Sequence, residues 1–319
     1  MVTGAAGFIG SRLVERLAEG GREVIAVDCL LGLPYPAAEK EIRLEALAAL
    51  SGVEIARLDL TEPAFTDLVT GAGAVINLAA LTGLNQSTSG ADYRRGNVTT
   101  AEAVVGACLA SGVGRLVHAS TSSVYGAVAD GDEDSPLEPI SEYGRTKLEG
   151  EWIVLEAAET EGLPATVLRY FSVFGPGQRP DMGYRRLIDA VLGEREFEVF
   201  GDGTQTRSAT FVDDVVEATV LALEAPTGAV TGEVFNVAGG ESVSLNEAIG
   251  VVEEVTGCKA SLVHLPARPG DQSRTAGDWS KARDVLGFSP SVSFPEGIER
   301  QIAWQREIRS GADRQGQVR

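Results

Sequence analysis

The sequence predicts an α/β fold in which a doubly wound parallel sheet carries a smaller α/β lobe. Two observations predict this class. Short apolar segments alternate with helical segments through the first half of the chain, as in a parallel sheet covered by helices on both faces. A glycine-rich turn, Gly4-Ala-Ala-Gly7-Phe-Ile-Gly10, lies between the first apolar segment and the first helical segment.

The strands of this sheet are expected at the apolar segments, because a strand buried on both faces shows a continuous apolar run. Such runs occupy residues 23–28, 53–58, 74–78, 115–119 and 165–169. The first strand is short, since only Met1-Val-Thr precedes the glycine turn, and we expect a late start or a truncated chain. Helices are predicted between the strands, where apolar residues such as Leu13 and Leu17 recur on one face.

The second half changes character at the turn-rich residues 174–180. We expect helices near 184–192, after Asp214, and near 245–255 and 279–286, with strands at 198–200 and near 234–237. The predicted domains are 1–170, with segments near 208–240 returning to it, a smaller lobe mainly over 171–308, and a flexible polar tail over 309–319.

The composition disfavours several partners. A formal net charge of −19 argues against binding to nucleic acid or to an anionic membrane. The sequence shows no signal peptide and no apolar run long enough to span a bilayer. Cys29, Cys108 and Cys258 are odd in number and lack Cys-x-x-Cys spacing, which indicates a reducing cytoplasm. With two histidines and no cluster of metal ligands, no metal site is expected.

The glycine turn predicts a dinucleotide site in the first domain. Gly4, Gly7 and Gly10 allow backbone N–H groups to approach a pyrophosphate at a helix N-terminus. Asp28 ends the second strand, where a carboxylate binds the ribose 2′-hydroxyl of NAD and repels the 2′-phosphate of NADP. Later strands reach the same edge of the sheet at Asp59-Leu60 and at Asn77-Leu78-Ala79-Ala80. The expected cofactor is therefore NAD.

Tyr143 and Lys147 predict proton transfer beside that cofactor. Four residues apart on a helix, they point the same way. A free tyrosine has a pKa of about 10, too high for a base at neutral pH. A nearby ammonium and the positive nicotinamide ring would lower this pKa. With Thr121 in Ser120-Thr-Ser-Ser-Val-Tyr125-Gly126, the pair indicates hydride chemistry on a sugar alcohol.

These motifs resemble the extended short-chain dehydrogenase/reductase family, with its Rossmann-type sheet and smaller substrate-binding lobe, and specifically its nucleotide-sugar epimerase/dehydratase branch. The resemblance covers nearly the whole chain, with matching segments at residues 3–10, 120–126, 143–147, 169–177, 201–207 and 268–271. It implies that Tyr143 takes the proton from the sugar 4-hydroxyl, while Lys147 lowers the tyrosine pKa and holds the nicotinamide ribose. Thr121 would bind the same hydroxyl, and NAD would stay bound through the cycle.

The resemblance implies further contacts and a quaternary structure. The implied cofactor contacts also include Phe8, Ile9, Leu60, Leu78, Ala79, Ala80, Asn97, Ser120 and Tyr170. At the nucleotide end, Arg207 and Arg268 match arginines that bind the diphosphate, Phe200 a residue near uracil, and Asp271 one near the ribose. Relatives carry Asp and an aromatic residue after this first arginine, whereas Ser208-Ala209 follow here, which puts its support in doubt. A homodimer through helices near 98–110 and 143–158 is expected.

Residues 121–123 separate the activities of the branch. In the branch that this chain resembles, the 4,6-dehydratases carry Thr-Asp-Glu there, and the UDP-glucuronate decarboxylases carry a segment like Thr-Ser-Glu. This chain has Thr121-Ser122-Ser123. Elimination of water needs a general acid and base, so the absence of a carboxylate disfavours it. Epimerisation remains, in which the 4-keto ring turns and takes hydride back on its opposite face.

The substrate is indicated by Gly177-Gln-Arg179-Pro-Asp-Met182, which resembles a segment of UDP-glucuronate 4-epimerases. Arg179 would bind the C6 carboxylate in a bidentate manner, with Ser122, Ser123 and Ser172 as hydroxyl donors. Most relatives have Asn at position 172. We therefore predict interconversion of UDP-glucuronate and UDP-galacturonate. The alternatives are a 4-epimerase of UDP-glucose or UDP-N-acetylglucosamine, a UDP-glucuronate decarboxylase, a nucleotide-sugar dehydratase, and an NAD-binding regulator without activity.

Overall fold

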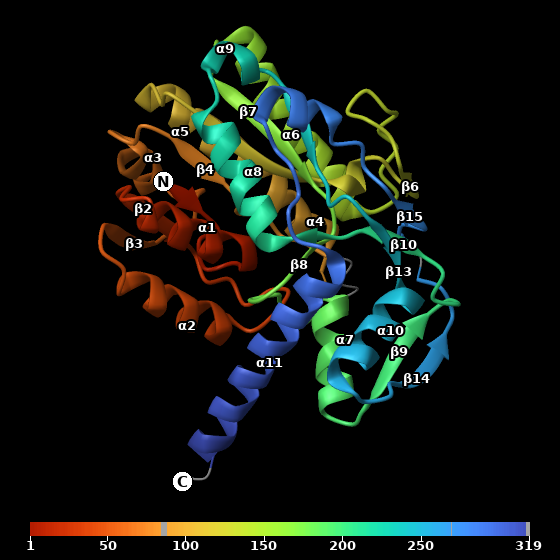
Figure 1. Ribbon diagram of the computed structural model, residues 1–319. Coiled ribbons are helices and arrows are strands. Elements are labelled where there is room, and N and C mark those ends of the chain that lie inside the picture. Colours follow the sequence, from red (N-terminus) through yellow and green to blue (C-terminus); the bar gives the residue numbers. More distant parts are fainter. Residues whose placement is uncertain (84–87, 269, 317–319) are drawn as a thin grey trace.

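The computed structural model describes residues 1–83, 88–268 and 270–316 and shows a central seven-stranded sheet (Figure 1). Its strand order is β12-β7-β5-β4-β1-β2-β3, and every pairing is parallel. The strands are β1 (Val2–Thr3), β2 (Val24–Asp28), β3 (Val53–Arg57), β4 (Val75–Asn77), β5 (Leu116–Thr121), β7 (Ala165–Tyr170) and β12 (Val234–Val237). The five apolar runs all form strands, and the doubly wound α/β class is confirmed.

The central strand β1 has two residues and is nevertheless paired on both sides. Val2 lies opposite Ala26 of β2 and Ile76 of β4. The N-terminal ammonium of Met1 donates to the Ala74 carbonyl at 2.9 Å, which extends the contact by one residue. Because the strand order reverses between β1 and β4, this point of the sheet edge opens a crevice for a ligand.

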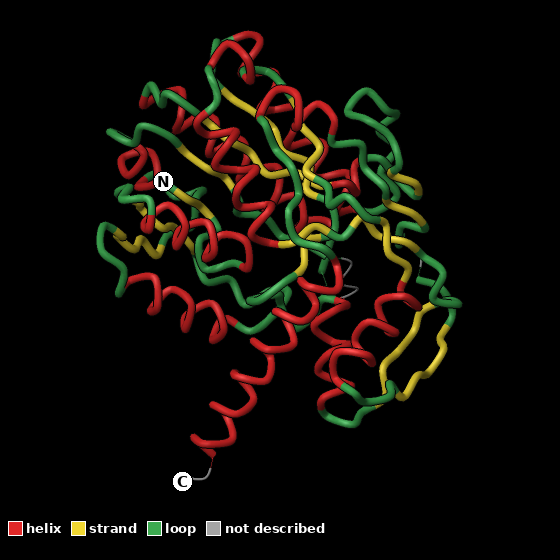
Figure 2. The backbone as a smooth tube through the Cα atoms, in the orientation of Figure 1, coloured by secondary structure: helices red, strands yellow, loops and turns green. Residues whose placement is uncertain are grey.

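Helices cover both faces of the sheet (Figure 2). One layer contains α1 (Phe8–Glu19), α2 (Ala37–Ala48) and α8 (Val212–Glu224), and α1 contacts both of the others. The opposite layer contains α3 (Ala64–Val69), α5 (Thr100–Ser111) and α6 (Glu142–Thr160). α5 follows α4 (Gly90–Arg94) through a π-helical turn, η1 (Arg95–Thr99).

The smaller lobe lies beside the carboxyl ends of the strands. Its helices are α7 (Gly183–Leu192) and α10 (Leu245–Thr256), which pack on each other. β9 (Glu196–Phe200) pairs with β14 (Ser261–Leu265) in parallel. The remaining short elements are β6 (Val128–Ala129), β8 (Val173–Phe174), β10 (Thr206–Ser208), β11 (Thr210–Phe211), β13 (Ser242–Ser244), β15 (Arg274–Thr275), α9 (Thr227–Val230), η2 (Ser122–Val124) and η3 (Ala282–Leu286).

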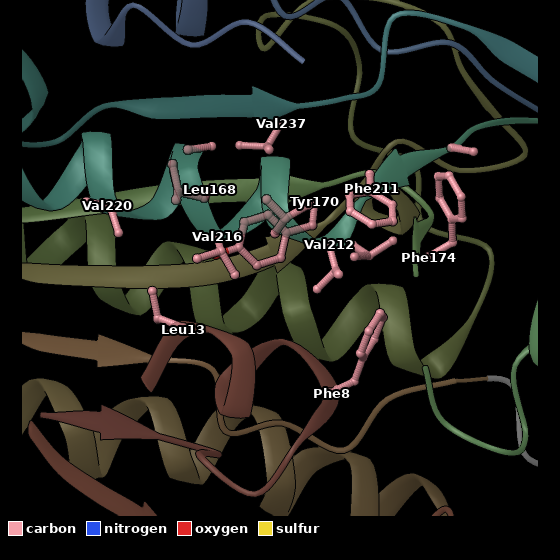
Figure 3. Packing of buried hydrophobic residues seen from close by; sticks show 14 of the residues in the cluster. Phe8, Leu13, Leu168, Tyr170, Phe174, Phe211, Val212, Val216, Val220 and Val237 are labelled. Atoms are coloured by element: carbon pink, nitrogen blue, oxygen red, sulfur yellow. The ribbon is translucent and has the colours of Figure 1, made fainter. Parts of the chain in front are cut away.

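One hydrophobic core joins the sheet to the lobe. Leu13 of α1, Leu168 of β7 and Val216 of α8 lie in the same cluster as Phe174 and Phe211 of the β8–β11 pair (Figure 3). The two phenylalanine rings meet edge to face, with centroids 5.7 Å apart. The lobe is therefore held against the nucleotide-binding edge by packing rather than by a linker.

Two segments near the C-terminus add detail to the expectation. Residues 280–286 are helical as expected, but the helix ends in the π-turn η3. α11 (Phe294–Gly316) continues as one helix past residue 309, and the flexibility expected over 309–319 stays a prediction. None of the helices in the described ranges is long and apolar enough to cross a membrane.

Candidate active site

A cavity of about 1270 Å³ opens at the carboxyl edge of the sheet, between the sheet and the lobe. Most of the residues predicted to bind a cofactor lie on its wall: Gly4, Gly7, Phe8, Ile9, Gly10, Asp28, Asp59, Leu60, Leu78, Ala79, Ala80, Ser120, Tyr143, Lys147 and Tyr170. So do most of the predicted substrate residues: Thr121, Ser122, Ser123, Ser172, Arg179, Phe200, Arg268 and Asp271.

Two predicted residues lie away from this wall. Asn97, in the π-helical turn η1, is buried, and its side chain bonds the Leu81 backbone and Thr146. Arg207 of β10 is paired with Asp271 at 2.7 Å. The ion pair holds the Arg207 side chain in place, which Ser208 and Ala209 cannot do. The supporting carboxylate comes from the segment after β14.

The glycine turn lets the backbone pass where side chains would collide. Gly4 has a φ of +67°, and a Cβ there would lie 2.8 Å from the Ala79 backbone. A Cβ on Gly10 would lie 2.2 Å from the Gly4 carbonyl oxygen. Asp28 holds the same edge, since its two carboxylate oxygens accept the backbone N–H groups of Ala6 at 3.1 Å and Leu30 at 2.8 Å. These features fit a dinucleotide with a free ribose 2′-hydroxyl, as in NAD.

Thr121, Tyr143 and Lys147 meet where β5 ends beside the first turns of α6. Ser141 caps α6 by accepting a backbone N–H at 3.1 Å, which fixes the start of the helix. Tyr143 lies close enough to Thr121 for the threonine hydroxyl to act on the tyrosine pKa, and Lys147 Nζ donates to the Ala119 carbonyl at 2.7 Å. Thr121, Tyr143 and Lys147 therefore line the same cavity as the glycine turn.

The electrostatics of this group differ from the expectation. Burial raises the pKa of Tyr143, against the hydrogen bond to Thr121 and the charge of Arg179, which both lower it. Burial lowers the pKa of Lys147 to about 8, against the charge of Glu151, which raises it. The predicted lowering of the tyrosine pKa is thus not achieved by the protein alone. Bound NAD would supply the positive nicotinamide ring that favours the phenolate.

Arg179 reaches the cavity already bound to protein groups. Its Nε and Nη2 donate to the Asp181 carboxylate at 3.0 and 2.7 Å, and its Nη1 donates to Thr82. The guanidinium also lies 5.8 Å from the centroid of the Tyr35 ring. One hydrogen on each of Nη1 and Nη2 remains for a ligand. Arg179 is thus positioned to receive a carboxylate, in competition with Asp181.

The backbone at Ser172 is unusual. Its φ is +32°, in the left-handed region that non-glycine residues rarely adopt. Its carbonyl accepts the backbone N–H of Thr210 at 3.2 Å, which links the end of β7 to β11. This conformation places residue 172 on the cavity wall close after Tyr170.

The nucleotide end of the cavity is formed by the lobe. The Arg268 guanidinium stacks on the Phe200 ring, with its carbon 3.6 Å from the centroid. Gln272, which the sequence did not single out, donates to the Ser122 carbonyl at 3.2 Å and the Gly126 carbonyl at 2.7 Å. Gln272 therefore connects the segment after β14 to the loop of residues 122–126.

Two residues of α2 that the sequence analysis did not single out bind segments around the cavity. Arg43 donates to the Tyr35 hydroxyl at 3.2 Å and to the carbonyls of Ala6 at 3.4 Å and Gly177 at 2.9 Å. Lys40 is also buried and donates to backbone carbonyls of the segment before α2. No short motif marks these residues, because each partner lies in a different segment.

The cavity is less acidic than the molecule. Its wall carries six cations, Lys40, Arg95, Lys147, Arg179, Arg186 and Arg268, and five carboxylates, Asp28, Asp59, Asp92, Asp181 and Asp271. The balance of +1 contrasts with the net charge of −19 for the chain. A local cationic site of this kind suits an anionic nucleotide. In the described part of the chain, no group of His, Cys, Asp and Glu side chains could hold a metal ion.

The model of the NAD dependent epimerase/dehydratase family matches residues 1–238. The chain belongs to this family. A UDP-glucuronate 4-epimerase of Thermodesulfobacterium geofontis (strain OPF15) is 35% identical over 316 residues, which cover 96% of each chain.

Solved structures of similar proteins contain both ligands that the cavity suits. The UDP-glucuronic acid 4-epimerase from Bacillus cereus, in complex with UDP-glucuronic acid and NAD, is 36% identical with a TM-score of 0.92. MoeE5 in complex with UDP-glucuronic acid and NAD is 40% identical with a TM-score of 0.85. Each alignment covers 96% of this chain and 98% of the other.

Proposed function

We propose that this protein is an NAD-dependent isomerase, a 4-epimerase that interconverts UDP-glucuronate and UDP-galacturonate. The observation that carries the proposal is that Arg179 shares the cavity with Tyr143, near enough for its charge to lower the tyrosine pKa. A sugar whose 4-hydroxyl meets Tyr143 would therefore have a guanidinium within reach of its C6 carboxylate. The similarity to UDP-glucuronate 4-epimerases of known structure supports this substrate.

Tyr143 accepts the proton of the sugar 4-hydroxyl, and Thr121 orients the same hydroxyl. The glycine turn and Asp28 would hold NAD, which would supply the acceptor for the C4 hydride, and Lys147 would hold the nicotinamide ribose beside Tyr143. The 4-keto sugar then turns, and return of the hydride to its opposite face inverts C4. Tyr143 takes this proton as the phenolate, is the neutral phenol while the 4-keto sugar exists, and gives the proton back, so it ends each cycle as the phenolate.

Residues 122 and 123 favour this outcome over elimination. Both are serines on the cavity wall, and a hydroxyl is too weak an acid or base to remove water from the sugar. Arg179, Ser122, Ser123 and Ser172 would instead hold the uronate carboxylate. A 4-keto uronate is a β-keto acid that tends to lose CO₂, and a carboxylate fixed in an unproductive orientation loses it more slowly.

A UDP-glucose 4-epimerase is the second candidate. It is favoured by the Arg179–Asp181 pair, in which the guanidinium already has a carboxylate partner and requires none from the sugar. MoeE5, at 40% identity, is also known in complex with UDP-glucose and NAD. The two candidates differ in which sugar is turned over faster.

The test is a panel of UDP-sugars incubated with purified protein and resolved by chromatography. We expect UDP-glucuronate to give a mixture with UDP-galacturonate and little CO₂. Faster conversion of UDP-glucose would overturn the uronate assignment in favour of the second candidate. A UDP-pentose as main product would indicate a decarboxylase, and binding of NAD without turnover of any UDP-sugar would indicate a regulator.

The same proposal includes a cytoplasmic homodimer. The three cysteines are free, which suits a reducing compartment. α5 and α6 pack side by side, and Trp152 of α6 is 56% exposed. An exposed tryptophan on a helix pair is typical of a subunit interface. Light scattering should give a dimer mass for the wild type and a monomer for Trp152→Glu; a wild-type monomer would refute this part.

A further inference from the structure

Glu151 is a fully buried carboxylate one helical turn beyond Lys147. Tyr143, Lys147 and Glu151 follow one another on α6 at four-residue spacing, so they share one face of the helix. Glu151 is 0% exposed and Lys147 is 3% exposed. Buried ionic groups persist only when other charges and hydrogen bonds compensate for the lost hydration.

Groups on two strands bind this carboxylate. Arg169 of β7 donates to Glu151 through Nε at 3.1 and 3.2 Å and through Nη2 at 2.8 Å. Ser120 of β5 donates its hydroxyl to the same carboxylate. Arg169 is itself fixed by the Tyr125 hydroxyl at 2.8 Å and the Glu133 carbonyl at 3.2 Å. The geometry is rigid and buried on all sides.

The charged and titratable groups around Lys147 come from three elements. On α6 they are Tyr143 and Glu151, and on β7 the nearest is Arg169, bound to the same carboxylate. On β5, His118 has a pKa that burial and the charge of Lys147 both lower, so it stays neutral. Among the described residues, Glu151 is thus the carboxylate that acts on the ammonium.

We propose that Glu151 is a positioning residue for the hydride-transfer step, because it places a buried carboxylate one helical turn from the Lys147 ammonium. Two buried cations lie near this one carboxylate: Arg169 binds it directly, and Lys147, which donates to the Ala119 carbonyl, lies one helical turn away. Without it, one cation would have to lose its proton, and an arginine guanidinium does not do so in proteins. Lys147 would therefore become neutral and would hold the nicotinamide ribose more weakly. The inference rests on the proposed role of Tyr143 and Lys147, and does not depend on which sugar is the substrate.

The direct test is the titration of Lys147 in the full-length, NAD-loaded protein. The chain has four lysines, Lys40, Lys147, Lys259 and Lys281, so ¹³C-labelled lysine gives a simple NMR spectrum. The Lys147 signal is assigned by its loss in Lys147→Arg. For Glu151→Gln we expect a fall in the lysine pKa of about one to two units, as for a charge one helical turn away at an intermediate dielectric constant. An unchanged Lys147 titration would overturn the proposal.

Other variants separate charge from packing. Glu151→Asp keeps the carboxylate and should restore most of the pKa. Arg169→Gln removes the competing cation and should raise the Lys147 pKa, so it tests the proposal in the opposite direction if Glu151→Gln does not fold. Glu133→Gln is the matched control, because it removes a neighbouring carboxylate charge, whose oxygen accepts the Asn236 backbone N–H, and leaves Glu151 in place. It should lower Tm and leave the Lys147 titration in place; an equal shift in this control would overturn the proposal.

The second readout is the pH profile of kcat at saturating NAD and substrate. Lys147 is charged below its pKa, so activity that needs the ammonium falls as pH rises through that value. In Glu151→Gln the fall should begin at a pH lower by the same one to two units. A purely structural role would reduce Tm and the active fraction but leave the midpoint in place. Because the NMR titration needs no sugar, failure of the uronate assignment would leave this test standing.

Discussion

Replacing Arg179 by glutamine should weaken turnover of UDP-glucuronate much more than binding of UDP-glucose. A guanidinium can give a sugar carboxylate two charge-assisted hydrogen bonds, each worth about 1.5–3 kcal/mol. Here Asp181 already takes two donors, at 3.0 and 2.7 Å, and neutralises part of the charge. The net loss should therefore be about 2–4 kcal/mol, or about a 30- to 1000-fold fall in kcat/KM.

The assay is kcat/KM for UDP-glucuronate beside the Kd of UDP-glucose, with Tm as a check on folding. In Arg179→Gln the unpaired Asp181 would also repel a uronate. The double variant Arg179→Gln/Asp181→Asn removes that repulsion and should recover part of the loss. Equal losses for both sugars, or a loss below threefold for the uronate, would show that Arg179 does not bind the carboxylate.

Three further outcomes are expected. Tyr143→Phe should still bind NAD but lose turnover by about 10²–10⁴-fold, since the proton acceptor is gone; activity within threefold of wild type would remove Tyr143 from the mechanism. Gly10→Ala places a Cβ 2.2 Å from the Gly4 carbonyl oxygen, so calorimetry should show weaker NAD binding and a lower Tm. Its control, Gly250→Ala, meets nothing within 4 Å inside α10 and should gain about 0.5–1 kcal/mol of stability; a parallel fall in both would contradict the steric reading. Burial raises the pKa of Cys108 to about 12, so a thiol reagent should modify it only after unfolding; rapid reaction in the native protein would disprove its burial.

The features that the sequence predicted best are those whose signal lies within a few neighbouring residues. Apolar runs gave all five expected strands, because a strand buried on both faces leaves a continuous signal. Tyr143 and Lys147 could be paired from helical periodicity, and the glycine turn from its position after a strand. Each of these signals lies within one element, so no knowledge of the tertiary fold was needed.

The sequence could not predict contacts that the fold creates between distant segments. Arg207 seemed unsupported because its partner, Asp271, lies 64 residues away. The direction of the Tyr143 pKa shift also depends on burial, which spacing does not reveal. The sequence also gave no sign that the Asn97 side chain bonds Leu81 and Thr146, and its contact with the cofactor stays a prediction.

The position of Arg43 has a consequence for the evolution of this enzyme class. One guanidinium holds the carbonyl of Ala6 in the glycine turn and that of Gly177, 134 residues from Arg43, in the segment that carries Arg179. A change in the backbone of residues 177–182 that alters the sugar preference therefore also shifts the glycine turn at the dinucleotide site, through Arg43. Because both acceptors are backbone carbonyls, a segment grafted from a relative should keep this link whenever it places the carbonyl of residue 177 within reach of Arg43.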